Sequence, residues 1–253
     1  MQAPGKTLQL LAAMAMLTVQ GCDAPVPTTP SASGEHAKDI LVGRAVKLQF
    51  DPANFVSVVN NRYNPLVPGT TFHYRTETPD GVETDEFQVT RNTKRILNVN
   101  ATVVHDQVFL NGELTEDTFD WFAQDRQGNV WHLGEDSKTL EHGQVVSTEG
   151  SWEAGVNGAE AGIVMLANPK SGLAYQQEFA AGVAEDNARV LGLKASVTVP
   201  YGKFDGCLET LEKTPLDRGA TEHKFYCSGV GLVLTVEPKG GPLRDELVSI
   251  THF

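Results

Sequence analysis

Short stretches in which apolar and polar residues alternate recur from residue 40 onward, separated by turn-forming residues. The clearest stretch is 191–199, where Leu, Leu, Ala, Val and Val occupy the odd positions between Gly, Lys, Ser and Thr. Such alternation places apolar side chains on one face of a β-strand and polar side chains on the other. We therefore expect an all-β fold with a single antiparallel domain that forms an open or closed barrel, with a sandwich as the alternative.

Other segments with strand character surround this stretch. They lie at residues 72–75, 87–89, 102–110, 174–179 and 247–252. The first two are expected to form a hairpin around the turn Pro79-Asp80-Gly81. Residues 184–193 contain good helix formers, but we expect a short turn followed by a strand there. The Gly- and Glu-rich residues 141–161 are predicted to form the longest loop.

The charge balance excludes one class of partner. Among 253 residues, 20 are Lys or Arg and 32 are Asp or Glu, so the formal net charge is −12. No basic block is present that would attract a phosphate backbone, and we expect no nucleic-acid partner. The apolar share of 40% is enough for one sizeable core.

The first 22 residues have the pattern of an export signal. Lys6 precedes an apolar stretch at 8–19, and Gly21 precedes Cys22. We interpret 1–22 as a lipoprotein signal peptide with Cys22 as the lipidation site, and an ordinary signal peptide is the alternative. Residues 23–39 are rich in Pro, Ser and Thr and are expected to be a flexible linker before a β-rich domain at 40–253. The expected location is the bacterial cell envelope, on the periplasmic or extracellular side, anchored in the inner or outer membrane by acyl chains.

Several segments of the body resemble an uncharacterised family of bacterial exported proteins. The segments read NPLVPGT from residue 64, EDTFDWFAQD from residue 116, GNVW from residue 128 with Gly134-Glu135, GVAED from residue 182 and GVGLV from residue 229. The resemblance extends over most of residues 50–236. It implies an exported β-rich domain and assigns no catalytic residue.

Two cysteines remain after Cys22. Cys207 and Cys227 lie in strand-like segments joined by a turn-rich stretch, and a hairpin centred on Asp217 places them opposite each other. The same register pairs Leu208 with Tyr226 and Thr210 with Lys224. Because disulfides persist outside the cytosol, we predict a disulfide between Cys207 and Cys227.

A second predicted hairpin contains the residues that most clearly suggest a functional site. Residues 117–136 are expected to fold over the turn 126–129, because Gly128 can adopt the positive φ of a tight turn. The resulting register pairs Asp120 with Glu135, Phe122 with Leu133, and Gln124 with Trp131.

Like charges directly opposite each other destabilise a sheet, so Asp120 and Glu135 need an explanation. Three remain open at this point. Both carboxylates lie in solvent, or a cation such as calcium neutralises them with help from Glu116, Asp117 or the pair Glu185 and Asp186, or one carboxyl stays protonated and the two act as an acid–base couple. No other cofactor is expected.

Aromatic residues on the same hairpin suggest a ligand site. Phe119, Trp121 and His132 are expected on the face opposite the carboxylates, so each face mixes apolar and polar groups, as in a barrel whose interior holds a ligand. The candidate ligand-binding residues are Phe119, Trp121, Trp131 and His132. The alternative is that both tryptophans are ordinary core residues.

These observations favour a non-enzymatic envelope lipoprotein that binds a ligand. Its partner would be a small hydrophobic molecule or an envelope protein. One alternative is a hydrolase that uses Asp120 and Glu135, with or without a metal ion; another is a structural or assembly partner in an envelope complex. The sequence contains no serine-hydrolase elbow, nucleotide-binding loop or His-Glu-x-x-His zinc motif.

Overall fold

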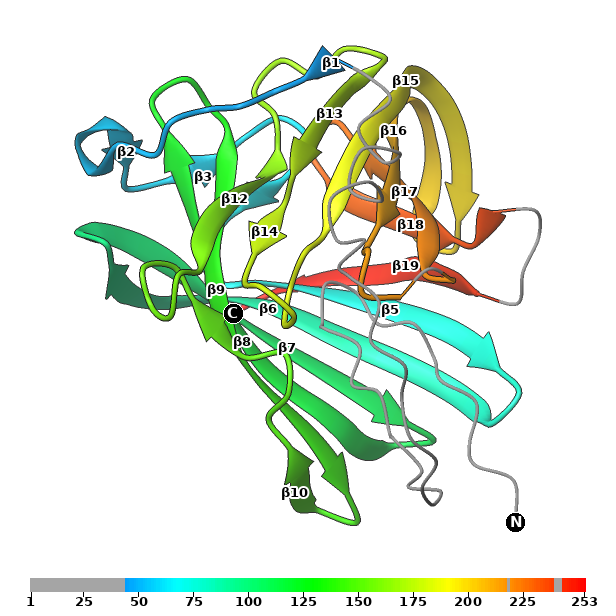
Figure 1. Cartoon of the computed structure of the whole chain (residues 1–253). Helices are drawn as coiled ribbons and strands as arrows, with labels where there is room; N and C mark the ends of the chain where they lie inside the picture. Colours follow the sequence, from blue (N-terminus) through cyan, green and yellow to red (C-terminus); the bar gives the residue numbers. More distant parts are fainter. Residues whose placement is uncertain (1–43, 218, 239–242) are drawn as a thin grey trace, which may run out of the picture.

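The β-strands predicted from the sequence dominate the structure (Figure 1). A computed structural model describes residues 44–217, 219–238 and 243–253. The predicted signal peptide, Cys22 and the predicted linker at 23–39 lie outside these residues. Within the described ranges, no helix has the length and hydropathy needed to cross a membrane.

The regular elements follow one another with few long connections. They are β1 (Arg44–Ala45), the 3-10 helix η2 (Pro52–Asn54), β2 (Phe55–Val56), β3 (Val59–Asn60), β4 (Pro65–Leu66), β5 (Thr70–Thr78), β6 (Gly81–Ile96), β7 (Val99–Leu110), β8 (Glu113–Asp125), β9 (Val130–Glu141), β10 (Gln144–Ser147), β11 (Trp152–Glu153), β12 (Glu160–Met165), β13 (Leu173–Gln176), β14 (Glu178–Phe179), β15 (Asn187–Val199), β16 (Gly202–Lys213), β17 (Thr221–Cys227), β18 (Gly231–Val236) and β19 (Arg244–His252).

One large antiparallel sheet nearly closes into a barrel. Strands β5 to β9 pair in chain order, β15 to β19 do the same, and β19 pairs with β5. Strands β12 to β14 bridge the gap between β9 and β15. Strand β12 pairs with both β9 and β14, and β13, which directly precedes β14, pairs with β15. In Figure 1, β5–β8 form one long wall, and β15–β18 form another that β19 joins to it. The prediction of a single antiparallel barrel-like domain is confirmed.

Individual strand predictions differ from the structure at two places. Register shifts within β15 move its buried face from Ala188 and Val190 to Val197 and Val199, so the alternation at 191–199 covers only part of a strand whose face changes. The expected long loop at 141–161 is wrong, because it contains β10 and β11, which both pair with β9. The hairpin around Pro79-Asp80 and the strand after residue 184 are confirmed.

The buried side of the sheet is not purely apolar. Leu133, Tyr175 and Leu247 belong to the core, but many carboxylates are buried beside them. These buried acids include Asp85, Asp106, Glu116, Asp120, Glu135, Glu178, Glu212, Glu222 and Asp245. In the described ranges the buried basic side chains are Lys224 and His132. Buried carboxylates require protons or cations to neutralise them, so this excess of acid is the main chemical feature of the interior.

Lys224 neutralises one group of these acids. Its Nζ lies 3.2 Å from Glu212 and 3.3 Å from Glu222. Glu212 also accepts hydrogen bonds from Gln177, Thr210 and Tyr226. Burial alone would lower the pKa of Lys224, but the two carboxylates raise it above its ordinary value. Because most members have partners within the group, we interpret this ion cluster as structural.

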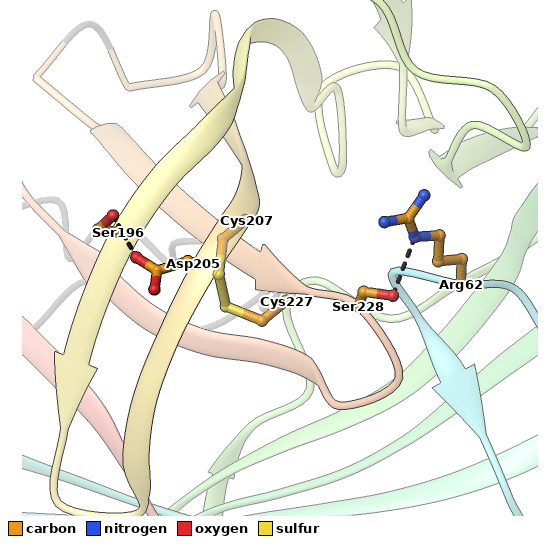
Figure 2. The surroundings of a disulfide bond; sticks show 6 residues. All are labelled: Arg62, Ser196, Asp205, Cys207, Cys227 and Ser228. Atoms are coloured by element: carbon orange, nitrogen blue, oxygen red, sulfur yellow. Dashed lines mark hydrogen bonds between the residues drawn. A yellow bond between two sulfur atoms is a disulfide. The ribbon is translucent and has the colours of Figure 1, made fainter.

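A disulfide joins β16 to β17 (Figure 2). Cys207 and Cys227 are bonded, and the neighbouring pairs Leu208–Tyr226 and Thr210–Lys224 have the register expected from the sequence. The predicted disulfide is confirmed. Both cysteines are buried, so the bond lies within the core.

Removing this disulfide should destabilise the domain by about 3 kcal/mol, the chain-entropy value for a loop of this size. The double variant Cys207→Ala/Cys227→Ala should show this loss in urea unfolding, and a reductant should affect the wild type but not the variant. The native fold should remain, because β16 and β17 still share their backbone ladder. A loss below about 1 kcal/mol would mean that packing alone holds these strands together.

Candidate metal centre

A β-bulge at Gly134 determines which side chains of the acidic hairpin face the barrel interior. Asp120 pairs with Glu135 as expected, but the register then shifts, so that Phe122 pairs with His132 rather than Leu133 and Gln124 pairs with Val130 rather than Trp131. Gly134 has φ +131°, a value that side chains rarely tolerate. The expected register was therefore wrong beyond Glu135. His132 consequently lies on the same buried face as Asp120 and Glu135, not on the opposite face.

Three potential ligands converge behind this bulge. One atom each of Asp120, His132 and Glu135 lie within 4.8 Å of one another. The exposed fractions of the residues are 2%, 0% and 1%, respectively. The explanation that Asp120 and Glu135 point into solvent is therefore wrong.

Glu178 on β14 holds the His132 ring in place. The ring Nδ1 lies 3.1 Å from a Glu178 oxygen, while Nε2 lies 3.4 Å from Oδ1 of Asp120. The approach of β14 depends on Gly162, which pairs with His132, because a Cβ there would overlap the backbone of Gln177. Metal-binding histidines commonly donate the N–H of the ring nitrogen that does not bind the metal to a carboxylate. Glu178 fits that positioning role and leaves Nε2 to face Asp120.

Aromatic rings enclose the imidazole on two sides. Phe122 stacks on the His132 ring at a centroid distance of 4.8 Å, and Trp152 of β11 contacts it edge-on at 5.2 Å. Trp152 also pairs with Glu135 in the sheet. These contacts restrict the rotamer of His132, as a preorganised ligand requires.

Several polar atoms of the group form no hydrogen bond among the described residues, although Nε2 of His132 and Oδ1 of Asp120 lie within ion-pair distance of each other. They are Oδ1 of Asp120, Nε2 of His132, both carboxylate oxygens of Glu135 and Nε1 of Trp152. An unpaired buried polar atom costs about 1–3 kcal/mol. Such atoms gathered at one point indicate a missing partner, and four of the five belong to ligand types that metal ions use.

Burial disfavours a cluster of ionised carboxylates without a positive charge beside them at this site. Burial, followed by the charges of Glu178, Asp120 and Glu116, raises the pKa of Glu135 well above its ordinary value. Burial by itself lowers the pKa of His132, but its interactions with Asp120 and Glu178 raise it to about 9. The site therefore favours positive charge, which a proton on His132 or a bound cation can supply.

The donor set distinguishes between metal ions. Calcium prefers oxygen ligands only, whereas one imidazole nitrogen with two carboxylate oxygens is typical of zinc and related transition metals. The predicted calcium set is brought together only in part. The Glu185 carboxylate instead accepts a hydrogen bond from the Gly182 amide. Asp186 lies beside Glu178, whose charge adds to burial in raising the Asp186 pKa.

The candidate ligand-binding aromatics are not gathered at one site. Trp131 donates a hydrogen bond to Asp125 and packs against Phe50 and Phe55, as a core residue does. Phe119 stacks on His105. Trp121 lines a pocket of about 430 Å³, whereas His132 belongs to the buried group with Asp120 and Glu135. A glycine inside the expected strand was the one sequence signal for the bulge that moves His132.

Comparisons with models of protein families, with curated proteins and with solved structures found no match. The resemblance to an exported family therefore stays a prediction.

Proposed function

We propose that this chain is a lipid-anchored envelope protein whose barrel binds one divalent transition-metal ion of the zinc class. The ligands would be Asp120, Glu135 and Nε2 of His132, with Glu178 as the positioning residue. The observation that carries the proposal is that ligand atoms of these three residues meet at one buried point without forming hydrogen bonds that would satisfy them. Three protein ligands leave a fourth tetrahedral position free, as in zinc sites that bind a water or a small ligand.

The disulfide supports the envelope part of this proposal. The bond between Cys207 and Cys227 suits an oxidising compartment such as the periplasm or the cell exterior. The pattern around Cys22 would anchor the domain there by acyl chains. Binding rather than catalysis is proposed because nothing in the described site identifies a reaction.

The full chain, purified in detergent without a histidine tag, should bind one zinc ion. The melting midpoint should rise on zinc addition and return with chelator, because a ligand at 100 times its Kd stabilises a fold by about 2.7 kcal/mol. Calcium at the same excess should give no shift. If zinc gives none either, the proton on His132 is sufficient to neutralise the cluster and the proposal fails.

Two variants locate the bound ion. His132→Gln and the nearly isosteric Asp120→Asn should each lower zinc affinity by at least about 100-fold, since both remove a ligand. The matched control is His105→Gln. His105 also pairs with a carboxylate, Asp117 at 2.6 Å, on the neighbouring strands β7 and β8, but it belongs to no buried group of ligands. Equal zinc affinity in all three variants would place the ion elsewhere.

A further inference from the structure

A pocket on the sheet holds the ammonium group of one of the protein's own lysines. The pocket has a volume of about 430 Å³, within the range of small-molecule sites. Two of the protein's three tryptophans, Trp121 and Trp152, line it. Lys94 Nζ lies 3.1 Å from the centre of the Trp121 ring and 2.8 Å from a Glu153 oxygen.

This arrangement has the chemistry of an organic-cation site. An ammonium group above an indole face is attracted by the ring quadrupole, and a carboxylate at its side offsets its positive charge and accepts a hydrogen bond from any N–H it carries. Glu135, Asp136 and Glu153 all line the pocket, and Lys94 is the one basic residue among its lining residues. Asp136 is already paired with Lys138 at 3.1 Å. Glu135 is only 1% exposed and belongs to the buried group with Asp120 and His132. Glu153 is therefore the exposed acceptor available to a ligand that takes the place of Lys94.

The lysine is placed so that it can leave. The side chains of Lys94 and Glu153 are 37% and 35% exposed, whereas Trp121 beneath them is only 6% exposed. An exposed ion pair contributes little stability. Moving Lys94 into solvent would lose this ion pair and the contact with the Trp121 ring, and would uncover an indole face and a carboxylate that a ligand cation can contact in the same way. Among the remaining lining residues, Val156, Ala159 and Val183 are small and apolar and suit the methyl or methylene groups of an amine.

We propose that this pocket binds a small organic cation with a primary or quaternary ammonium head, for which the Lys94 ammonium is a built-in competitor. The proposal does not depend on the metal ion. Because Glu135 belongs to both the pocket and the proposed metal centre, binding is to be measured in the presence of chelator. A protein that fails to bind zinc can then still bind the organic cation, and a protein that fails to bind the organic cation can still bind zinc.

Calorimetric titration of the full chain in detergent with choline and with n-butylammonium tests the proposal. Wild-type protein should bind weakly, and Lys94→Ala should bind at least one of the two probes at least tenfold more tightly, because the internal competitor is gone. The neutral choline isostere 3,3-dimethylbutan-1-ol should bind Lys94→Ala at least tenfold more weakly than choline does if the quaternary head is the one preferred. The uncharged variant Lys94→Gln serves the same purpose if the alanine variant does not fold.

Two further variants separate a cation site from a merely exposed pocket. In the Lys94→Ala background, Trp121→Leu or Glu153→Gln should reverse the gain. Arg62→Ala is the matched control, since the Arg62 guanidinium lies 5.0 Å from the centre of the Tyr63 ring, neither residue lines this pocket, and its removal should change nothing. The proposal is overturned if Lys94→Ala binds both probes no better than the wild type does. It is also overturned if Lys94→Ala binds the neutral alcohol as tightly as choline and binds n-butylammonium no better than the wild type does.

Discussion

Replacing Gly134 by alanine should destabilise the barrel by about 3 kcal/mol and lower zinc affinity at least tenfold. The backbone at Gly134 has φ +131°, and an added Cβ would overlap the carbonyl oxygen of Trp152 on the paired strand β11. Forcing a side chain into such a conformation costs about 1–3 kcal/mol, and the overlap adds to it. Relief of this strain requires either displacement of β11 or loss of the bulge, and both disturb His132.

The control for this variant is another glycine with positive φ. Gly143 has φ +74°, and an added Cβ there would meet no atom within 4 Å. Gly143→Ala should therefore cost only about 1 kcal/mol and leave zinc binding unchanged. Urea unfolding and zinc titration check both variants. Equal stability and zinc affinity for the two would show that the bulge does not position the site.

The metal-free protein should lose stability as the pH rises from about 4 to about 7. Burial raises the pKa of Asp106 to about 7. Burial also raises the pKa of Asp245 to about 7, with contributions from the charges of Glu83 and Glu222 against the hydrogen bond from Thr76 and the charge of Lys224. An aspartate in the unfolded chain has a pKa near 4.

The sign follows from proton binding. Between about pH 4 and pH 7 the folded state holds protons that the unfolded state has lost. These groups therefore stabilise the fold fully below about pH 4, and the stabilisation disappears as the pH rises through about 7. Each pKa unit corresponds to about 1.4 kcal/mol, so the total decline should reach several kcal/mol. Urea unfolding in chelator at pH 4.5, 6 and 7.5 measures it.

One substitution separates this effect from general charge repulsion. The side chain at position 245 cannot titrate in the variant Asp245→Asn. The free energy of unfolding of this variant should therefore fall with pH by at least about 1.4 kcal/mol less than that of the wild type. Asp117→Asn is the control, because Asp117 is only half-buried and forms hydrogen bonds with His105 and Gln107. A wild-type stability that stays constant or increases with pH would contradict the burial of these carboxylates.

The fold could be predicted because its determinants are local. Alternation of apolar residues and turn residues such as Gly128 and Pro79 locate strands and hairpins without knowledge of distant contacts. The disulfide followed from the same logic, since the hairpin that pairs Leu208 with Tyr226 also places Cys207 near Cys227. Within the acidic hairpin, the pairing of Asp120 with Glu135 needed only the turn.

The site could be predicted only in part because it depends on non-local contacts. The bulge at Gly134 forms where β11 pairs with β9, and no local pattern shows that contact. Glu178 reaches His132 only because Gly162 lets β14 approach. Acids in a strand pattern are normally interpreted as solvent-facing, so buried carboxylates such as Asp106 and Asp245 went unpredicted.

The most direct test of the metal centre is a crystal structure of the full chain grown with zinc, with anomalous data collected on both sides of the zinc absorption edge. We expect one strong anomalous peak inside the barrel, bonded to Nε2 of His132 and to oxygens of Asp120 and Glu135, with Nδ1 still bonded to Glu178. An interior without an anomalous peak, with zinc bound only at exposed histidines such as His142, would contradict the proposed metal centre.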